Sequence, residues 1–302
     1  RQARHTSAPL SPAPQRRSSA TDRGTAPASD GRVVLSHTVT VDFAAVVTAV
    51  DALATATGLP KLRIKDAMAK GAVWLQRGTR KPQRLRRVTT PLMRGDRLSI
   101  HYDSAVLASK PPAATLVADH KRYSVWWKPA GLLVEGSKFG DHATLARQIE
   151  EHFGGRREVH LVHRLDLEAS GLVIAAHSSG ATARLSALFQ QRAVDKRYRI
   201  TVKGDLRSHS NARRAPTESG GSGPRPRTGQ AALQPDLGRI ELALDGKSAV
   251  TEFRLEAVDE AAGTSTLEVR MFTGRYHQIR RHFAALGAPV LGDPRYGRGA
   301  GS

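Results

Sequence analysis

The chain is 302 residues long and strongly basic, with 47 Lys and Arg against 27 Asp and Glu and a formal net charge of +20. It contains no Cys, which excludes disulfides and thiolate metal sites, and its apolar runs are too short to cross a membrane. So basic a chain is expected to bind a polyanion, nucleic acid before an anionic membrane surface. We expect a soluble, cytoplasmic monomer that does not bind membranes.

Residues 1–30 are rich in Arg, Ser, Ala and Pro and poor in acids. This composition is typical of a disordered leader, and it also resembles an organellar transit peptide. The segment holds five Arg and two Asp, so it accounts for only +3 of the total charge. Most of the basic excess therefore belongs to segments that are expected to fold.

The pattern over residues 31–103 predicts a small domain. Apolar residues recur at helical spacing over Val41–Thr57, and a second, shorter helix is predicted over Arg63–Lys70. A strand over Ala72–Leu75 follows, and then a basic hairpin through Arg87. A tight turn is expected at residues 94–96.

This small domain carries much of the charge, because residues 61–103 contain 12 Lys and Arg and only three Asp. Such a unit can lay one face on phosphates. In its order of helices, strand and basic hairpin it resembles the αL RNA-binding domain found in a small-subunit ribosomal protein and in tyrosyl-tRNA synthetases. A plain surface hairpin is the alternative interpretation.

Residues 104–116 are predicted to be a linker, and residues 117–298 a larger domain. Helices are predicted over 144–152, 181–193 and 277–286, and strands over 123–127, 172–177, 198–202, 240–244, 249–255 and 265–272. Strands in runs with few helices favour an α+β fold over a parallel βαβ arrangement. Residues 205–237, which are rich in Gly and Ser, are predicted to be a flexible insertion.

The segment His163–Leu172 is the most informative part of the chain. It places Asp166 between a basic dipeptide and a Ser-Gly turn, just before an apolar strand. A carboxylate in a loop beside a strand end is a common catalytic placement. Taken alone, Asp166 could equally cap a turn or pair with Arg164.

Four segments together resemble the RluA-type pseudouridine synthase family, and they occur in the family's order. They are Lys128-Pro129-Ala130-Gly131-Leu132, His163–Leu172, Lys196-Arg197-Tyr198, and Thr273-Gly274-Arg275-Tyr276-His277-Gln278-Ile279-Arg280 with the following Gly292-Asp293-Pro294-Arg295-Tyr296-Gly297. A weaker match lies at residues 246–251. The sequence departs from the family pattern at Ala169, where Thr is usual, and at Tyr276, where Thr or Ser is usual.

The resemblance implies a fold and a set of catalytic residues. The fold is α+β, a mixed and largely antiparallel sheet with flanking helices and a cleft across it. Asp166 corresponds to the catalytic Asp, and Tyr198 to an aromatic that packs on the uracil and is a candidate for proton transfer. Arg280 corresponds to the Arg that pairs with the catalytic carboxylate. Tyr198 could alternatively be a plain strand aromatic.

The same resemblance implies four substrate-binding residues: Arg164, Arg275, His277 and Lys128. Of these, His277 is expected to be more structural than catalytic. Glu168 stands two residues after Asp166 and could form a glycosidase-like carboxylate pair with it, but it falls at an unspecified position of the pattern and is interpreted as solvated. His160 and His163 lack further ligand-type partners, so no metal site is expected.

The implied reaction is the isomerisation of uridine to pseudouridine in structured RNA, which needs no redox change, group donor or cofactor. A carboxylate can act as a nucleophile on the uracil or the sugar, or it can remove a sugar proton, and the sequence does not choose between these routes. The target base must be flipped out to reach the pocket. Ribosomal RNA is the expected substrate, with transfer RNA as the alternative.

Two further interpretations compete. A non-catalytic RNA-binding or ribosome-assembly factor would keep the same shape, although the joint presence of Asp166, Tyr198 and Arg280 argues against it. A general DNA- or membrane-binding protein would explain the charge but not the ordered motifs.

Overall fold

The computed structural model describes residues 31–42, 48–210 and 237–297, which fall into two compact units. The first comprises the described residues up to Pro111 together with Glu135–Thr144, and the second comprises Pro112–Val134 and the described residues from Leu145 onward. The predicted leader 1–30 and most of the predicted insertion 205–237 lie outside the described residues. No helix in the described part of the chain is both long and apolar enough to span a membrane.

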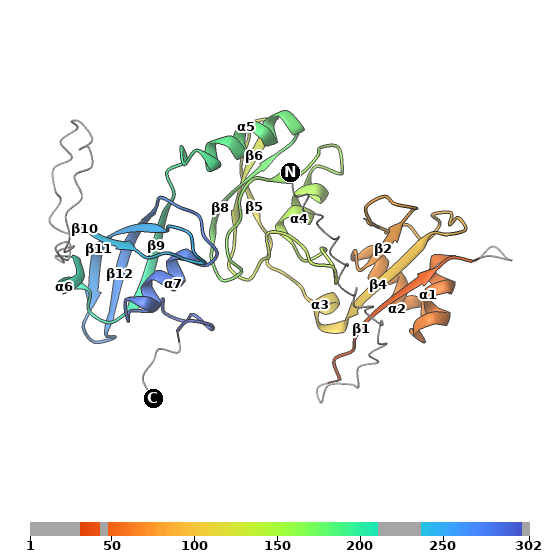
Figure 1. Ribbon diagram of the computed structural model, residues 1–302, viewed down its shortest axis with the longest axis horizontal. Coiled ribbons are helices and arrows are strands. Elements are labelled where there is room, and N and C mark those ends of the chain that lie inside the picture. Colours follow the sequence, from red (N-terminus) through yellow and green to blue (C-terminus); the bar gives the residue numbers. More distant parts are fainter. Residues whose placement is uncertain (1–30, 43–47, 211–236, 298–302) are drawn as a thin grey trace, which may run out of the picture. The chain divides into compact units, whose positions relative to one another are not determined.

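The first unit contains a four-stranded antiparallel sheet in the order β1-β4-β2-β3 (Figure 1). These strands are β1 (Val34–Thr40), β2 (Val73–Gln76), β3 (Gln83–Arg84) and β4 (Arg97–Asp103). The helices are α1 (Ala49–Thr57), α2 (Lys61–Ala69) and α3 (Ser104–Ala108). The predicted helix over Val41–Thr57 is thus shorter: Val41 and Asp42 are not helical, and residues 43–47 lie outside the description.

Local signals explain where the helices of this unit begin and end. The Thr48 hydroxyl accepts a hydrogen bond from the Asp51 amide and caps α1, and Gly58 ends the helix in the left-handed conformation at φ 71°. Leu53 and Ile64 from the helices pack in one buried cluster with Leu98 of β4. This apolar cluster gives the unit a core of its own.

The loop Glu135–Thr144 is held to the first unit by Asp141. The Asp141 carboxylate accepts hydrogen bonds from Arg86 at 2.5–2.7 Å and lies 3.0 Å from Arg84 Nε. The Asp141 amide also donates to the Lys70 carbonyl at 3.1 Å. Two of the cations of the basic hairpin are therefore neutralised within the protein.

The second unit contains two four-stranded sheets (Figure 1). One has the order β5-β6-β8-β7 and comprises β5 (Thr115–Asp119), β6 (Tyr123–Lys128), β7 (His160–Leu161) and β8 (Gly171–Ala176). The other has the order β10-β11-β12-β9 and comprises β9 (Arg197–Lys203), β10 (Leu237–Glu241), β11 (Val250–Asp259) and β12 (Thr264–Met271). The helices are α4 (Leu145–His152), α5 (Ser179–Gln190), α6 (Arg207–Ser210) and α7 (Gln278–Ala285).

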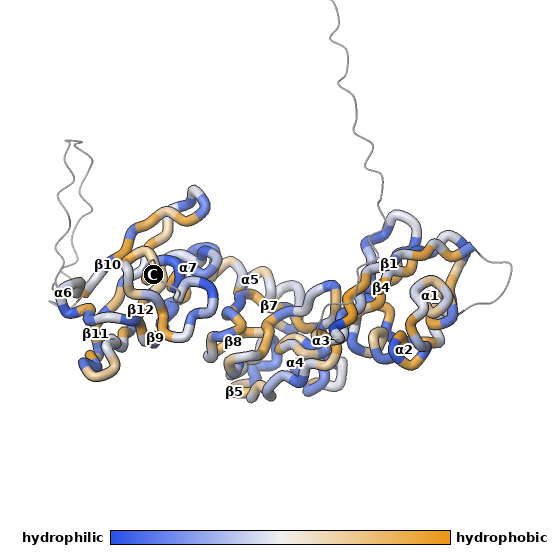
Figure 2. Tube along the Cα trace, turned by 90° about the horizontal axis from the view of Figure 1, so that it is seen from below, coloured by the Kyte–Doolittle hydropathy of each residue, from blue (hydrophilic) through white to orange (hydrophobic). Residues whose placement is uncertain are grey.

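Every strand pairing in the described residues is antiparallel, and helices are few, so the predicted α+β class is confirmed. Figure 2 shows hydrophobic and hydrophilic residues mixed along the chain, and buried positions alternate with more exposed ones along β4 and β12. This is the pattern of sheets that bury one face. Each sheet of the second unit has its own apolar cluster, one with α4 and one with Phe283 of α7, and Tyr198 packs against both.

The predicted linker over residues 104–116 begins with a short helix, and residues 109–114 are irregular. Asp103 accepts hydrogen bonds from the Ala105 and Val106 amides and caps the short helix α3, and β5 begins at Thr115. The division between the units falls within this stretch, at Pro111 and Pro112.

Candidate active site

The candidate catalytic carboxylate, Asp166, lies in the loop between β7 and β8 of the second unit. Its side chain is 26% exposed, so it can be reached from solvent. Two neighbours anchor the loop: Leu165 is buried, and the half-buried His163 accepts a hydrogen bond from the Ile174 amide at 3.0 Å while its ring stacks on Phe189. The loop therefore presents the carboxylate on a fixed base.

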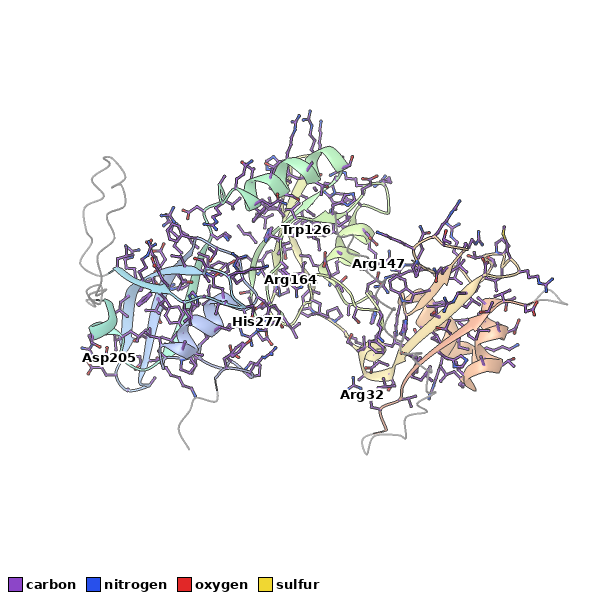
Figure 3. The ribbon with its side chains drawn as sticks, in the orientation of Figure 1. Arg32, Trp126, Arg147, Arg164, Asp205 and His277 are labelled. Carbon is purple, nitrogen blue, oxygen red and sulfur yellow. The ribbon has the colours of Figure 1, made fainter. Side chains whose placement is uncertain are left out.

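Arg280 of α7 meets this carboxylate. Its Nη1 donates a hydrogen bond to Asp166 Oδ2 at 3.4 Å. This contact joins the loop before β8 to the helix after β12. Figure 3 shows the approach of the two segments, marked by Arg164 on one and His277 on the other. The sequence predicted this pairing, and the structure brings the two residues together.

The strongest partner of Arg280 is Asp293, to which the sequence assigned no role. Arg280 Nε donates to Asp293 Oδ2 at 2.6 Å and Nη2 donates to Oδ1 at 2.8 Å. The Asp293 side chain is 2% exposed, and the guanidinium holds the pKa of its carboxyl well below the usual range. A two-pronged pair of this kind fixes the plane of the guanidinium.

Only Nη1 of Arg280 remains for the site, and three acceptors share it. They are Asp166 Oδ2 at 3.4 Å, Glu168 Oε2 at 3.4 Å and His277 Nε2 at 3.3 Å. Glu168 was interpreted as solvated, and its side chain is indeed 49% exposed, but it also contacts the same nitrogen as Asp166. The two carboxylates thus compete for one donor.

His277 lies between these groups in a left-handed conformation, at φ 52°. Because a guanidinium only donates, the contact with Arg280 makes His277 Nε2 an acceptor, and the proton then resides on Nδ1, which donates to Tyr296 Oη at 3.3 Å. Burial, the largest cause, lowers the pKa of His277; the Asp166 charge opposes that shift and the Arg280 charge acts with it. The imidazole is therefore neutral at pH 7.

A buried hydrogen-bond network shapes the turn that carries His277. The Gln278 side-chain oxygen accepts from the Thr273 hydroxyl at 2.6 Å and from the Arg275 amide at 3.1 Å. The Gln278 amide nitrogen donates to the Val250 carbonyl at 3.0 Å, which ties the turn to β11. Arg275 Nε donates to the Ser248 carbonyl at 3.2 Å, and Arg275 is half-buried.

Lys128 is not placed to contact RNA, and the sequence-based prediction for this residue is wrong. Its side chain is completely buried, and its Nζ donates to the carbonyls of Leu132 at 2.8 Å, Pro129 at 3.0 Å and Leu167 at 3.4 Å. Burial lowers the pKa of Lys128, and the charge of Asp166 opposes that shift. The ammonium joins the turn after β6 to the Asp166 loop, as does the Gly131 amide, which donates to the Leu167 carbonyl at 2.8 Å.

The remaining two residues differ in exposure. Arg164 is exposed two residues before Asp166. Tyr198 on β9 is half-buried, and burial together with the Asp166 charge raises the pKa of its phenol. Tyr198 therefore stays protonated at neutral pH and can donate a hydrogen bond.

Comparison with known proteins shows which family has a similar sequence. Residues 122–285 match the family model described as RNA pseudouridylate synthase. An uncharacterized RNA pseudouridine synthase of Aquifex aeolicus is 31% identical over 244 residues, covering 78% of this chain and 71% of that protein. Ribosomal large subunit pseudouridine synthase D of Zymomonas mobilis is 33% identical over 184 residues, covering 57% of this chain and 52% of that protein.

Among solved structures, human RNA Pseudouridylate Synthase Domain Containing 1 aligns with a TM-score of 0.46 at 21% identity, covering 63% of this chain and 73% of that one. The chain spans about half the length of the Zymomonas relative. The family model alone covers more than half of the chain, and it includes both the Asp166 loop and Arg280. The chain belongs to the RluA-type pseudouridine synthase family, whose members are isomerases that convert uridine to pseudouridine in RNA.

Proposed function

We propose that this chain isomerises uridine to pseudouridine in large-subunit ribosomal RNA, with Asp166 as the catalytic carboxylate. The observation that carries the proposal is the contact of the partly exposed Asp166 carboxylate with Arg280, a cation that is itself fixed by the buried Asp293. Family membership supports the reaction, and relatives named for the large ribosomal subunit support the substrate.

The reaction exchanges one bond of the uridine for another. The bond from sugar carbon 1′ to ring nitrogen 1 breaks, and a bond from carbon 1′ to ring carbon 5 forms. Carbon 5 loses a proton and nitrogen 1 gains one, so no electrons enter or leave. Asp166 assists either by adding to the uracil or the sugar as a nucleophile or by removing a sugar proton, and both roles require its ionised form. Arg280 Nη1 stabilises that charge and orients the carboxylate.

Tyr198 supports the flipped base. An aromatic that packs against both apolar clusters of the unit is held rigidly, and it offers a uracil a stacking surface. The raised pKa of its phenol argues against proton removal by Tyr198, because the phenolate is scarce at neutral pH. Its role in this proposal is therefore to pack on the ring and donate a hydrogen bond.

The first unit supplies phosphate contacts. Eight of its cations are exposed and have no acidic partner within the described ranges: Arg63, Lys65, Arg80, Lys81, Arg87, Arg97, Lys110 and Lys138. Unpaired surface cations release counterions when they meet phosphates, so they add affinity without sequence preference. We assign this unit the role of an αL-like RNA-binding domain.

Chemical mapping of pseudouridine tests the proposal. Total RNA is compared between cells that contain the protein and cells that lack it. The expected result is at least one uridine of large-subunit ribosomal RNA that is modified only when the protein is present. Modification confined to transfer RNA would show that transfer RNA, and not ribosomal RNA, is the substrate. Identical maps would favour a non-catalytic RNA-binding factor.

A further inference from the structure

Tyr276 places an exposed aromatic ring next to the candidate active site. Its ring stacks on His277 with centroids 3.7 Å apart and planes 21° apart, and the residue is 55% exposed. His277 Nε2 in turn lies 3.8 Å from Asp166 Oδ2. One imidazole therefore separates the Tyr276 ring from the catalytic carboxylate of the proposed function.

The stack is rigid on its inner side. Side chains of adjacent residues point in different directions in a helix or a strand, but the left-handed backbone at His277 turns the chain so that the two rings face each other. The imidazole is fixed by its contacts with Arg280 and Tyr296. Tyr276 thus has a fixed partner beneath it, while more than half of the residue faces solvent.

Nothing within the described residues explains this exposure as packing. The Tyr276 hydroxyl has no hydrogen-bond partner there, and the residue belongs to none of the apolar clusters of the second unit. The motif that this segment resembles has Thr or Ser at the position, and neither can stack. A large exposed aromatic that replaces a small polar residue beside a catalytic group needs another explanation.

We propose that Tyr276 is a stacking platform for an unpaired nucleobase adjacent to the extruded uridine. The inference rests on the proposed function. Extrusion of one base leaves its neighbours without a stacking partner, and a tyrosine ring can supply one for any base because every base has a π-face. Tyr276 is then a determinant of substrate binding that this chain adds to the motif.

The affinity test uses the Asp166→Asn protein, so that RNA is bound without turnover. The probe is a synthetic stem–loop RNA whose loop places 2-aminopurine beside a uridine. Tyr276→Leu removes the aromatic ring but still covers His277, and Tyr276→Phe keeps the ring and loses only the hydroxyl. Tyr123→Leu is the matched control, because the Tyr123 ring also stacks on a histidine, with the His120 centroid 4.7 Å away. Tyr123 pairs with Ala176, at the end of the β6–β8 pairing that is opposite to the Asp166 loop.

Loss of the platform in Tyr276→Leu is expected to raise the Kd about 5- to 150-fold, as measured for the loss of one base–aromatic stack. Tyr276→Phe should restore the affinity, and Tyr123→Leu should leave it unchanged. The 2-aminopurine fluorescence should be quenched on binding by proteins with Tyr or Phe at position 276 and stay bright with Leu.

Equal affinity of the Leu and Phe variants would overturn the inference, because Tyr276 would then merely shield His277 from water. Bright 2-aminopurine in the Tyr276 protein would overturn it as well. The comparison does not depend on catalysis, so a protein without synthase activity would contradict the proposed function and still give a readable result here.

Discussion

Arg280 reaches Asp166 with one nitrogen only, because Asp293 takes the other two. The pair Arg280–Asp293 is the best-formed ion pair of the candidate site, at 2.6 and 2.8 Å, and the Asp166 contact is longer, at 3.4 Å. The buried Asp293 carboxylate therefore orients the guanidinium, and the partly exposed Asp166 carboxylate remains accessible to the substrate.

Replacing Asp293 with Ala should both destabilise the protein and lower turnover. Removing one partner of a buried ion pair leaves a charge without compensation, at a cost of about 3–5 kcal/mol in the free energy of unfolding. The substitution also removes the acceptor of two hydrogen bonds, because the Arg295 and Tyr296 amides donate to Asp293 Oδ1 at 2.8 and 2.9 Å. Chemical denaturation and kcat on an RNA transcript are the measurements.

Asp245→Ala is the control, because Asp245 pairs with the neighbouring Arg281 at 2.9 Å but is 69% exposed. Its removal should shift the denaturation midpoint little, since exposed ion pairs contribute little. Equal destabilisation by the two substitutions would contradict the role assigned to Asp293.

Lys128 and Arg164 should behave differently even though the sequence assigned both to RNA binding. Arg164→Gln should weaken RNA binding and reduce the slope of log affinity against log salt by about 1, as expected for one lost phosphate contact. Lys128→Met should leave that slope unchanged but lower stability, because each carbonyl left without its donor costs about 1–3 kcal/mol. A reduced salt slope in Lys128→Met would show that its ammonium reaches the RNA.

The positions of most secondary-structure elements of the second unit could be predicted from the sequence, because turns and apolar periods mark them clearly. Strand β1 could not. Its inward positions include His37 as well as Leu35 and Val39, and all are only half-buried, so its alternation is weak. Helix α3 was missed because the paired prolines after it suggested a linker. Its N-terminal cap, Asp103, is also the last residue of β4, so the sequence shows no separate start signal for the helix.

The candidate site was predictable only in part. The motifs identified Asp166 and Arg280, and the structure joins them. The roles of Lys128 and Asp293 depend on their burial. Lys128 is fully buried and the Asp293 side chain is nearly so, and nothing in their local sequence shows that. Asp293 stood in a recognised segment, so its Gly-Asp-Pro context was the one signal that could have suggested a role.

Acid should destabilise the protein through His163. The pKa of His163 is lowered from 6.5 to about 4, first by burial and then by the Lys196 charge. Between these values the unfolded chain binds a proton that the folded protein excludes, so the free energy of unfolding falls as the pH drops from about 6.5 to about 4, by about 3 kcal/mol in all.

The measurement is urea denaturation at pH values across that window. In His163→Gln the side-chain oxygen can still accept from the Ile174 amide but does not titrate, so the pH dependence should be shallower than in the wild-type protein. Other buried histidines contribute equally to both proteins and cancel in the comparison. Identical pH dependences would mean that His163 does not exclude the proton.

Asp166 and Glu168 provide the most direct test of the account, because their carboxylates lie at the same distance, 3.4 Å, from the same nitrogen of Arg280. The measurement is pseudouridine formed on an unmodified transcript of large-subunit ribosomal RNA by the Asp166→Asn and Glu168→Gln proteins, with RNA affinity measured alongside. We predict that Asp166→Asn lowers turnover by about 10⁴-fold or more at nearly unchanged affinity, the scale of losing an essential catalytic group, whereas Glu168→Gln retains substantial turnover. Equal turnover by the two variants, or full activity of Asp166→Asn, would contradict the assignment of the catalytic carboxylate.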